Sequence, residues 1–103
     1  EARFSTSIWN KFWKNLDDNL CRQVIPRLPF EELVMSSLQL PEKTREKIAR
    51  FLTEDKAERF MDPPAGASMI DVFSARETVY EKGNQRIESI SGLSPSEWSL
   101  PSS

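Results

Sequence analysis

Side chains that could carry out chemistry are few in this sequence of 103 residues. It contains no histidine and a single cysteine, Cys21, so the usual ligands of zinc and the usual thiol–imidazole pair are lacking. Three scattered glycines, at 66, 83 and 92, do not make a phosphate-binding loop. Adjacent carboxylates occur at Asp17-Asp18 and Glu31-Glu32, where they suit the positive end of a helix. The sequence therefore predicts no enzyme activity and no cofactor or metal.

Both carboxylate pairs belong to the stretch 16–38, which reads LDDNLCRQVIPRLPFEELVMSSL. Apolar residues recur every four positions in its first half, at Leu20, Val24 and Leu28. This spacing places them on one face of a helix. Pro26 has no backbone N–H and its ring crowds the preceding turn, so we expect this first helix to span Asp18–Ile25.

The second half of the stretch predicts another short helix. Pro29 suits a first helical position, and the acidic pair after it favours the helix's N-terminal end. Leu33, Val34, Ser37 and Leu38 would supply the buried face of a helix over Glu31–Leu38. The stretch thus predicts a tight helical hairpin.

The order of these residues resembles the F-box, the helical module of substrate receptors in Skp–cullin–F-box ubiquitin ligases. A leucine, an acidic pair, a leucine and a valine four residues apart, Leu-Pro, a second acidic pair and a leucine occur in this order, and the alignment needs no gap. Asp17 stands where the family usually has proline, and the family's later tryptophan is missing after the hairpin.

The resemblance implies an adaptor that binds a Skp-type subunit and recruits substrates to a cullin-based ubiquitin ligase, in the cytoplasm or nucleus. It also implies which residues carry the contact with that subunit: Leu16, Leu20, Val24, Leu28, Pro29 and Leu33. The alternative is that the same apolar pattern forms a self-contained core. The protein would then be a small helical interaction or scaffold module with no role in ubiquitin ligation.

Aromatic residues precede the hairpin in a four-residue rhythm. The stripe comprises Phe4, Ile8, Phe12 and Leu16, widened by Trp9 and Trp13. It predicts a helix over Ser7–Asn15, with Ser5, Thr6 or Ser7 as its cap. We expect these rings to complete the core of the hairpin. A membrane-surface helix is the rival interpretation, but its basic face would have Lys11 and Lys14 alone.

Beyond the hairpin, apolar spacing predicts one long helix over Glu42–Phe60, followed by a linker at 62–67 rich in proline, glycine and alanine. Residues 68–83 suit either a helix capped by Ser68 and closed by Gly83, or a β-hairpin turning at Gly83-Asn84. Residues 84–103 read as a flexible tail in which Leu93, Trp98 and Leu100 stand out.

Composition agrees with a small all-α protein built on residues 1–61. The net charge is −2, and no segment has the basic excess that nucleic-acid binding requires. No run of about 20 apolar residues could span a bilayer. A lone cysteine fits a reducing compartment, in keeping with a cytoplasmic or nuclear protein that binds other proteins.

Overall fold

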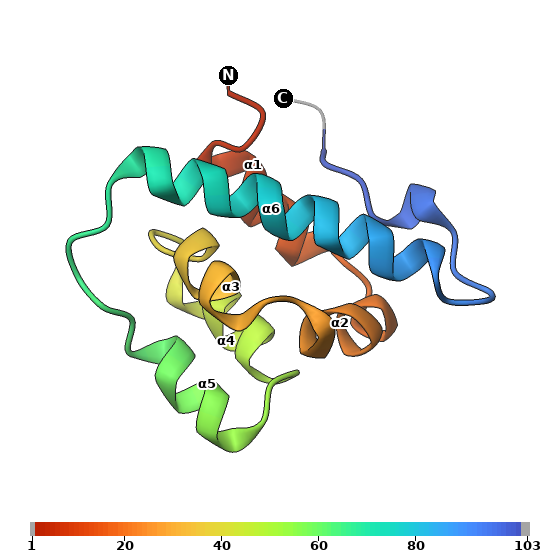
Figure 1. Ribbon diagram of the computed structural model, residues 1–103, viewed down its shortest axis with the longest axis horizontal. Coiled ribbons are helices and arrows are strands. Elements are labelled where there is room, and N and C mark those ends of the chain that lie inside the picture. Colours follow the sequence, from red (N-terminus) through yellow and green to blue (C-terminus); the bar gives the residue numbers. More distant parts are fainter. Residues whose placement is uncertain (1, 102–103) are drawn as a thin grey trace.

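The computed structural model describes residues 2–101, and every regular element in that range is a helix (Figure 1). In chain order the elements are α1 (Thr6–Asn15), α2 (Asp18–Val24), the 3-10 turn η1 (Ile25–Arg27), α3 (Phe30–Ser36), α4 (Glu42–Ala49), α5 (Glu54–Met61), α6 (Met69–Glu88) and the 3-10 turn η2 (Pro95–Glu97). The predicted all-α class is confirmed. None of the described helices is both long and apolar enough to cross a membrane.

Short polar side chains begin several of these helices. Ser5 Oγ accepts a hydrogen bond from the Ile8 N–H (3.2 Å) at the start of α1, and an Asp17 carboxylate oxygen accepts one from the Asn19 N–H (3.1 Å) at the start of α2. These acceptors satisfy backbone donors that have no partner within the helix. The first three helices consequently lie within two residues of their predicted bounds.

The predicted helix over Glu42–Phe60 is wrong, because the chain turns between α4 and α5. Thr53 Oγ1 accepts from the Lys56 N–H (3.4 Å) and starts a new helix there. Phe51 and Leu52, in the turn, are half-buried and pack against the core. Burying these two side chains favours the turn over a continuous helix.

The segment 68–83 lies in a helix, and the β-hairpin alternative is wrong. Ser68 caps α6 as expected, with its Oγ accepting from the Asp71 N–H (3.2 Å). Gly83 does not close the helix, which continues to Glu88. This glycine is required for space: a Cβ at that position would overlap the ring of Trp98.

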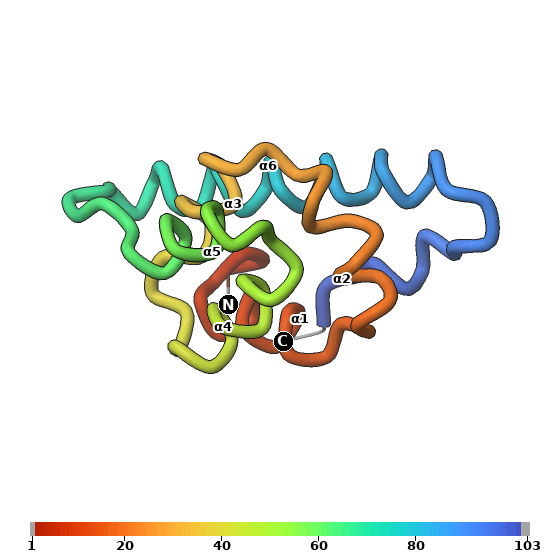
Figure 2. Tube along the Cα trace, turned by 90° about the horizontal axis from the view of Figure 1, so that it is seen from below, coloured from red at the N-terminus to blue at the C-terminus, as the bar shows by residue number. Residues whose placement is uncertain are grey.

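Helix α6 extends along one side of the molecule and packs closely on α3 (Figure 1). Figure 2 shows α1 and α4 on the side away from α6, whereas α3 lies next to α6. Side chains of α1, the hairpin and α6 therefore meet in one interior. The core is not confined to residues 1–61, because Val79, Tyr80 and Ile87 of α6 also belong to it.

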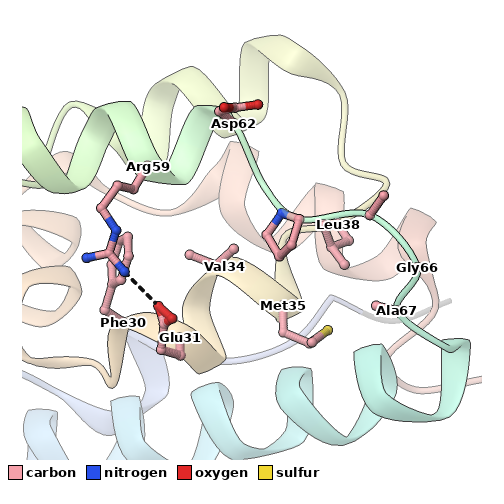
Figure 3. A pocket seen from close by; sticks show the side chains of 11 residues that line it. Phe30, Glu31, Val34, Met35, Leu38, Arg59, Asp62, Gly66 and Ala67 are labelled. Atoms are coloured by element: carbon pink, nitrogen blue, oxygen red, sulfur yellow. Dashed lines mark hydrogen bonds and ion pairs between the residues drawn. The ribbon is translucent and has the colours of Figure 1, made fainter.

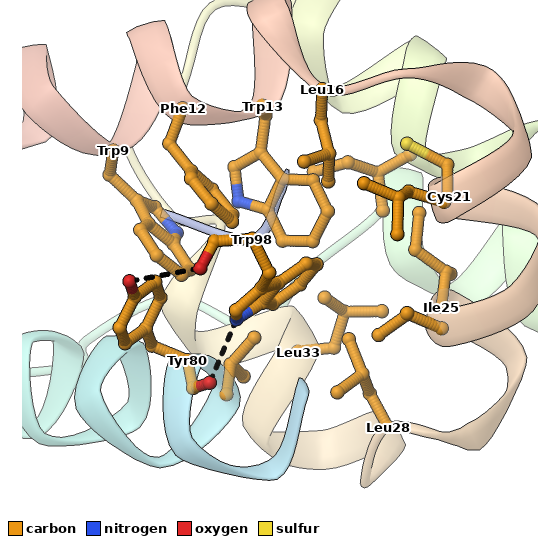
Figure 4. Close-up of a cluster of buried hydrophobic side chains, with 14 of the residues drawn as sticks. Trp9, Phe12, Trp13, Leu16, Cys21, Ile25, Leu28, Leu33, Tyr80 and Trp98 are labelled. Atoms are coloured by element: carbon orange, nitrogen blue, oxygen red, sulfur yellow. Dashed lines mark hydrogen bonds between the residues drawn. The ribbon is translucent and has the colours of Figure 1, made fainter. Parts of the chain in front are cut away.

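Aromatic rings fill the centre of the core (Figure 4). The α1 rings expected there, Trp9, Phe12 and Trp13, are buried and lie within 5.5 Å of one another, centroid to centroid. The prediction that the stripe covers the hairpin is thus confirmed. A membrane-surface role for α1 would need these rings exposed, and they are not.

Trp98 fills the same core from the opposite end of the chain. Its indole Nε1–H donates to the Tyr80 carbonyl (2.9 Å), and the Tyr80 hydroxyl donates to the Trp98 carbonyl (3.2 Å) (Figure 4). Only 1% of Trp98 is exposed, whereas most other residues of the segment 89–101 are exposed. The segment expected to be a tail is thus anchored by one side chain; Ser102 and Ser103 lie outside the described residues.

A buried arginine joins three parts of the chain. Arg76 of α6 is fully buried and donates to the carbonyls of Ser36 (3.0 Å), Phe4 (2.8 Å) and Leu38 (2.9 Å). Burial lowers the pKa of Arg76 to about 10, so the guanidinium remains charged at neutral pH. Its bonds to Phe4 and Ser36 are buried and the bond to Leu38 is partly buried, so the arginine satisfies backbone oxygens that lie largely away from water.

Cys21 is the core residue that its position on the hairpin suggests. It is fully buried, and burial raises the pKa of its thiol to about 11. The thiol is therefore protonated at neutral pH, and a protonated, enclosed thiol is a poor nucleophile.

Candidate interaction surface

The residues that the F-box resemblance assigns to a partner lie mostly in the core. Leu16, Leu20, Val24, Leu28 and Leu33 are all buried, and Pro29 alone of the six is exposed. The strip they form faces the side chains of α1 and α6 and so holds the protein together (Figure 4). In this conformation a partner cannot reach it.

The opposite side of α3 is open and lines a groove of about 360 Å³ (Figure 3). We call this the α3 groove. Its lining comes from α3, the end of α5 and the connection between α5 and α6: Phe30, Glu31, Val34, Met35, Leu38, Arg59, Asp62 and residues 64–67.

Helical spacing explains the apolar wall of the α3 groove. Phe30 and Val34 are four residues apart on one face of α3, Met35 lies beside them, and Leu38 follows in the turn after the helix. Phe30, Met35 and Leu38 are only half-buried, although they are large and apolar. Such contiguous, partly exposed apolar side chains are typical of a surface that another molecule covers.

The facing wall is irregular backbone with small side chains. Pro63 and Pro64 lack the N–H that a helix would use, so α5 cannot continue past Asp62. Gly66 has φ +91°, a conformation that favours glycine. Because Ala65 and Ala67 have short side chains and Gly66 has none, the groove stays open above α3 (Figure 3).

An ion pair lies at one end of the groove. Arg59 Nη2 is 3.2 Å from Glu31 Oε1, and the Arg59 guanidinium lies over the Phe30 ring at 4.8 Å from its centroid (Figure 3). Both charged side chains are mostly exposed, and such surface pairs contribute little to stability. The pair does neutralise the one cation that lines the groove.

Carboxylates dominate the surface next to the α3 groove. A second hollow of about 290 Å³ shares Glu31 and Met35 with it and is otherwise lined by Glu32, Asp71 and Ser74. No cation lines this hollow. Ile70, adjacent to Asp71 in sequence, is 80% exposed, the largest exposure among the described large apolar residues. The surface therefore combines apolar contact area with a negative rim.

This arrangement suits contact with another molecule. Among residues 2–101, no three carboxylate or thiol side chains cluster as a metal site would need. The groove's carboxylates, Glu31 and Asp62, are exposed. Apolar side chains flanked by one sign of charge are what a protein partner recognises.

The six residues predicted to contact a partner thus lie mainly on the buried side of α2 and α3, whereas the groove lies on the exposed side of α3. A four-residue row at 30, 34 and 38 was visible in the sequence, yet it could not be distinguished from a second core stripe. The facing wall, residues 62–67, has no regular spacing of apolar residues that could be recognised in the sequence. These residues connect α5 to α6, and their position depends on where those two helices pack.

Comparison of the chain with models of protein families, with curated proteins and with solved structures gives no match. The F-box resemblance therefore stays a prediction from the sequence, and the function has to be inferred from the surface itself.

Proposed function

We propose that the protein is a small helical interaction module and that the α3 groove binds a segment of a partner protein. The observation that carries this proposal is the row of half-buried apolar side chains on the outer face of α3. The core uses this face only in part: Val34 belongs to the core and Phe30 packs against it, whereas Met35 and Leu38 are half-buried and are not among the core side chains.

The charge around the groove indicates the chemistry of the partner. Glu32, Asp62 and Asp71 make no ion pair among the described residues, and they surround an apolar surface. A partner segment that carries aliphatic or aromatic side chains with lysine or arginine beside them complements both features. Opposite charges at the rim would speed association and fix the segment's orientation.

An amphipathic helical peptide of leucine and lysine is a direct probe of this surface. We expect it to bind with shifts of the amide NMR signals centred on α3 and residues 64–67, and we expect its leucine–glutamate counterpart not to bind. Glu32→Lys combined with Asp71→Lys should weaken binding about tenfold, since both substitutions reverse rim charges.

Glu81→Lys is the matched control, because Glu81 is an exposed carboxylate of α6 that lines neither hollow. It should change the affinity less than twofold or so, which is within the usual effect of a distant surface charge. Equal binding of the two peptides, or equal losses in the control and the double variant, would contradict the proposal.

A Skp-type adaptor is the second candidate partner. The observation that supports it is that two short helices, α2 and α3, occur one after the other in the sequence that resembles the F-box, with Pro29 exposed at the N-cap of α3. Because the apolar strip is buried, such an adaptor would have to contact the outer face of the hairpin. Size-exclusion chromatography of the unmodified chain mixed with a purified Skp-type adaptor tests this directly, and failure to co-elute rejects it.

A further inference from the structure

A hollow of the opposite charge lies on the other side of the hairpin, where the connection between α4 and α5 approaches α2 (Figure 1). We call it the cationic hollow; its volume is about 400 Å³. It is lined by Arg22, Pro26, Arg50, Phe51, Leu52, Thr53 and Lys56. Its volume lies within the range of small-ligand pockets, roughly 300–1,000 Å³.

Three cations from three different elements converge on this hollow. Arg22 comes from α2, Arg50 from the C-cap of α4 and Lys56 from the first turn of α5. Within the described part of the chain, none of their charged groups makes an ion pair or a hydrogen bond to another residue. Carboxylates occur nearby in the sequence, at Glu46 and Glu54, but none lines the hollow.

The apolar side of the hollow is held in place by the core. Phe51 and Leu52 are half-buried against the core, and their backbone N–H groups donate to the carbonyls of Ile48 and Ala49 (both 3.1 Å). The Arg22 guanidinium lies 5.8 Å from the Phe51 ring centroid. The turn that interrupts the expected long helix thus places an aromatic ring beside the Arg22 guanidinium.

We propose that the cationic hollow binds a phosphomonoester attached to an apolar group. A phosphomonoester carries close to two negative charges at neutral pH and three acceptor oxygens, which suits two guanidinium groups and one ammonium better than a single carboxylate does. The phosphate alone would fill a small part of the volume. The remainder, bounded by Phe51, Leu52 and Pro26, suits an aromatic ring or a short aliphatic chain.

The α3 groove and the cationic hollow share no lining residue and have opposite charge, although the Lys56 ammonium of the hollow lies 5.8 Å from the centroid of the Phe30 ring in the groove. Arg22 lies over the Phe51 ring and, among the described residues, makes no ion pair or ring contact with a groove residue, so its variant is the one that disables the hollow alone. A basic peptide at the groove and a phosphomonoester at the hollow should bind to the same molecule together.

Phenyl phosphate is a suitable probe, with inorganic phosphate and phenol as its two separate halves. We expect phenyl phosphate to shift the NMR signals of Arg50, Phe51, Leu52 and Thr53 and to bind at least about tenfold more tightly than either half, because both parts of the hollow are then filled. Raising the salt concentration should weaken this binding. Equal affinity for phenyl phosphate and inorganic phosphate, or binding to neither, would overturn the proposal.

Variants test whether the three cations are responsible. Arg22→Gln and Lys56→Gln should each lower the affinity for phenyl phosphate about fivefold or more, because each removes a charge-assisted hydrogen bond. Their matched controls are Arg27→Gln and Lys82→Gln, exposed cations that do not line the hollow. Equal losses in variants and controls would show only non-specific attraction and would refute the site. Melting temperatures of all four variants establish that they fold.

A phosphomonoester could come from a small metabolite or from a phosphorylated aromatic side chain of a protein. A short peptide containing phosphotyrosine distinguishes these sources. Affinity about tenfold above that of phenyl phosphate would identify a peptide ligand, since the flanking residues must then contribute contacts. Affinity equal to or below that of phenyl phosphate would identify a free small molecule.

Discussion

Replacing Trp98 by alanine should lower the free energy of unfolding by about 3–5 kcal/mol, the usual cost of truncating a large buried aromatic side chain. The Trp98 ring lies 4.8 Å from the Phe12 ring and 5.8 Å from the Trp13 ring, centroid to centroid. The ring also donates a hydrogen bond from its indole N–H to the Tyr80 carbonyl. Its removal would leave a cavity between α1 and α6. Urea unfolding followed by circular dichroism measures the loss.

Two further variants distinguish the loss of Trp98 packing from the loss of any apolar side chain. Ile70→Ala removes a side chain that is 80% exposed and should change the unfolding free energy by less than about 0.5 kcal/mol. Gly83→Ala should be clearly destabilising although alanine favours helices, because its Cβ would overlap Trp98. If Trp98→Ala were as mild as Ile70→Ala, the segment after α6 would not be anchored in the core.

The second large effect is expected at Arg76. Replacing it by methionine preserves much of the side chain's length but leaves the carbonyls of Phe4, Ser36 and Leu38 without their donor. We expect a loss of about 3 kcal/mol, because each buried unsatisfied carbonyl is costly, while removing a desolvated charge recovers part of that cost.

Arg76→Lys should give an intermediate loss, since an ammonium keeps the charge but cannot present donors in the planar fork that reaches three separate carbonyls. Lys82→Met, an exposed substitution on the same helix, serves as the control and should be near neutral. Calorimetric unfolding of the three variants under one condition provides the comparison. Equal stability of Arg76→Met and the unmodified chain would mean that water satisfies the three carbonyls.

The short helices could be predicted from sequence because local signals specify them. Four-residue apolar spacing and a polar cap are present together for α1 and α2, so their bounds follow closely. The break before α5 was missed because Thr53, its cap, lies inside a longer periodic pattern. Only the burial of Phe51 and Leu52 against distant elements makes the turn the better solution.

Gly83 and Trp98 show where local reasoning fails. A glycine next to asparagine indicates a turn or a helix end, and a tryptophan in a segment rich in serine and proline indicates a docking motif. The two residues instead pack together: Gly83, which has no side chain, leaves the space that the Trp98 ring fills. Nothing in the spacing along the chain encodes such a pairing. The α3 groove and the cationic hollow were missed for the same reason, because both form between segments that are separate in sequence.

The position of Trp98 also has a consequence for biosynthesis. The rings of Phe12 and Trp13 belong to the first of the six described α-helices, whereas the ring that completes their packing is synthesised after all six. Until it emerges, the growing polypeptide has helices with exposed aromatic faces that it cannot cover fully. We therefore expect these helices to reach the compact state only after Trp98 is made, and a product that stops before Trp98 to be prone to aggregation.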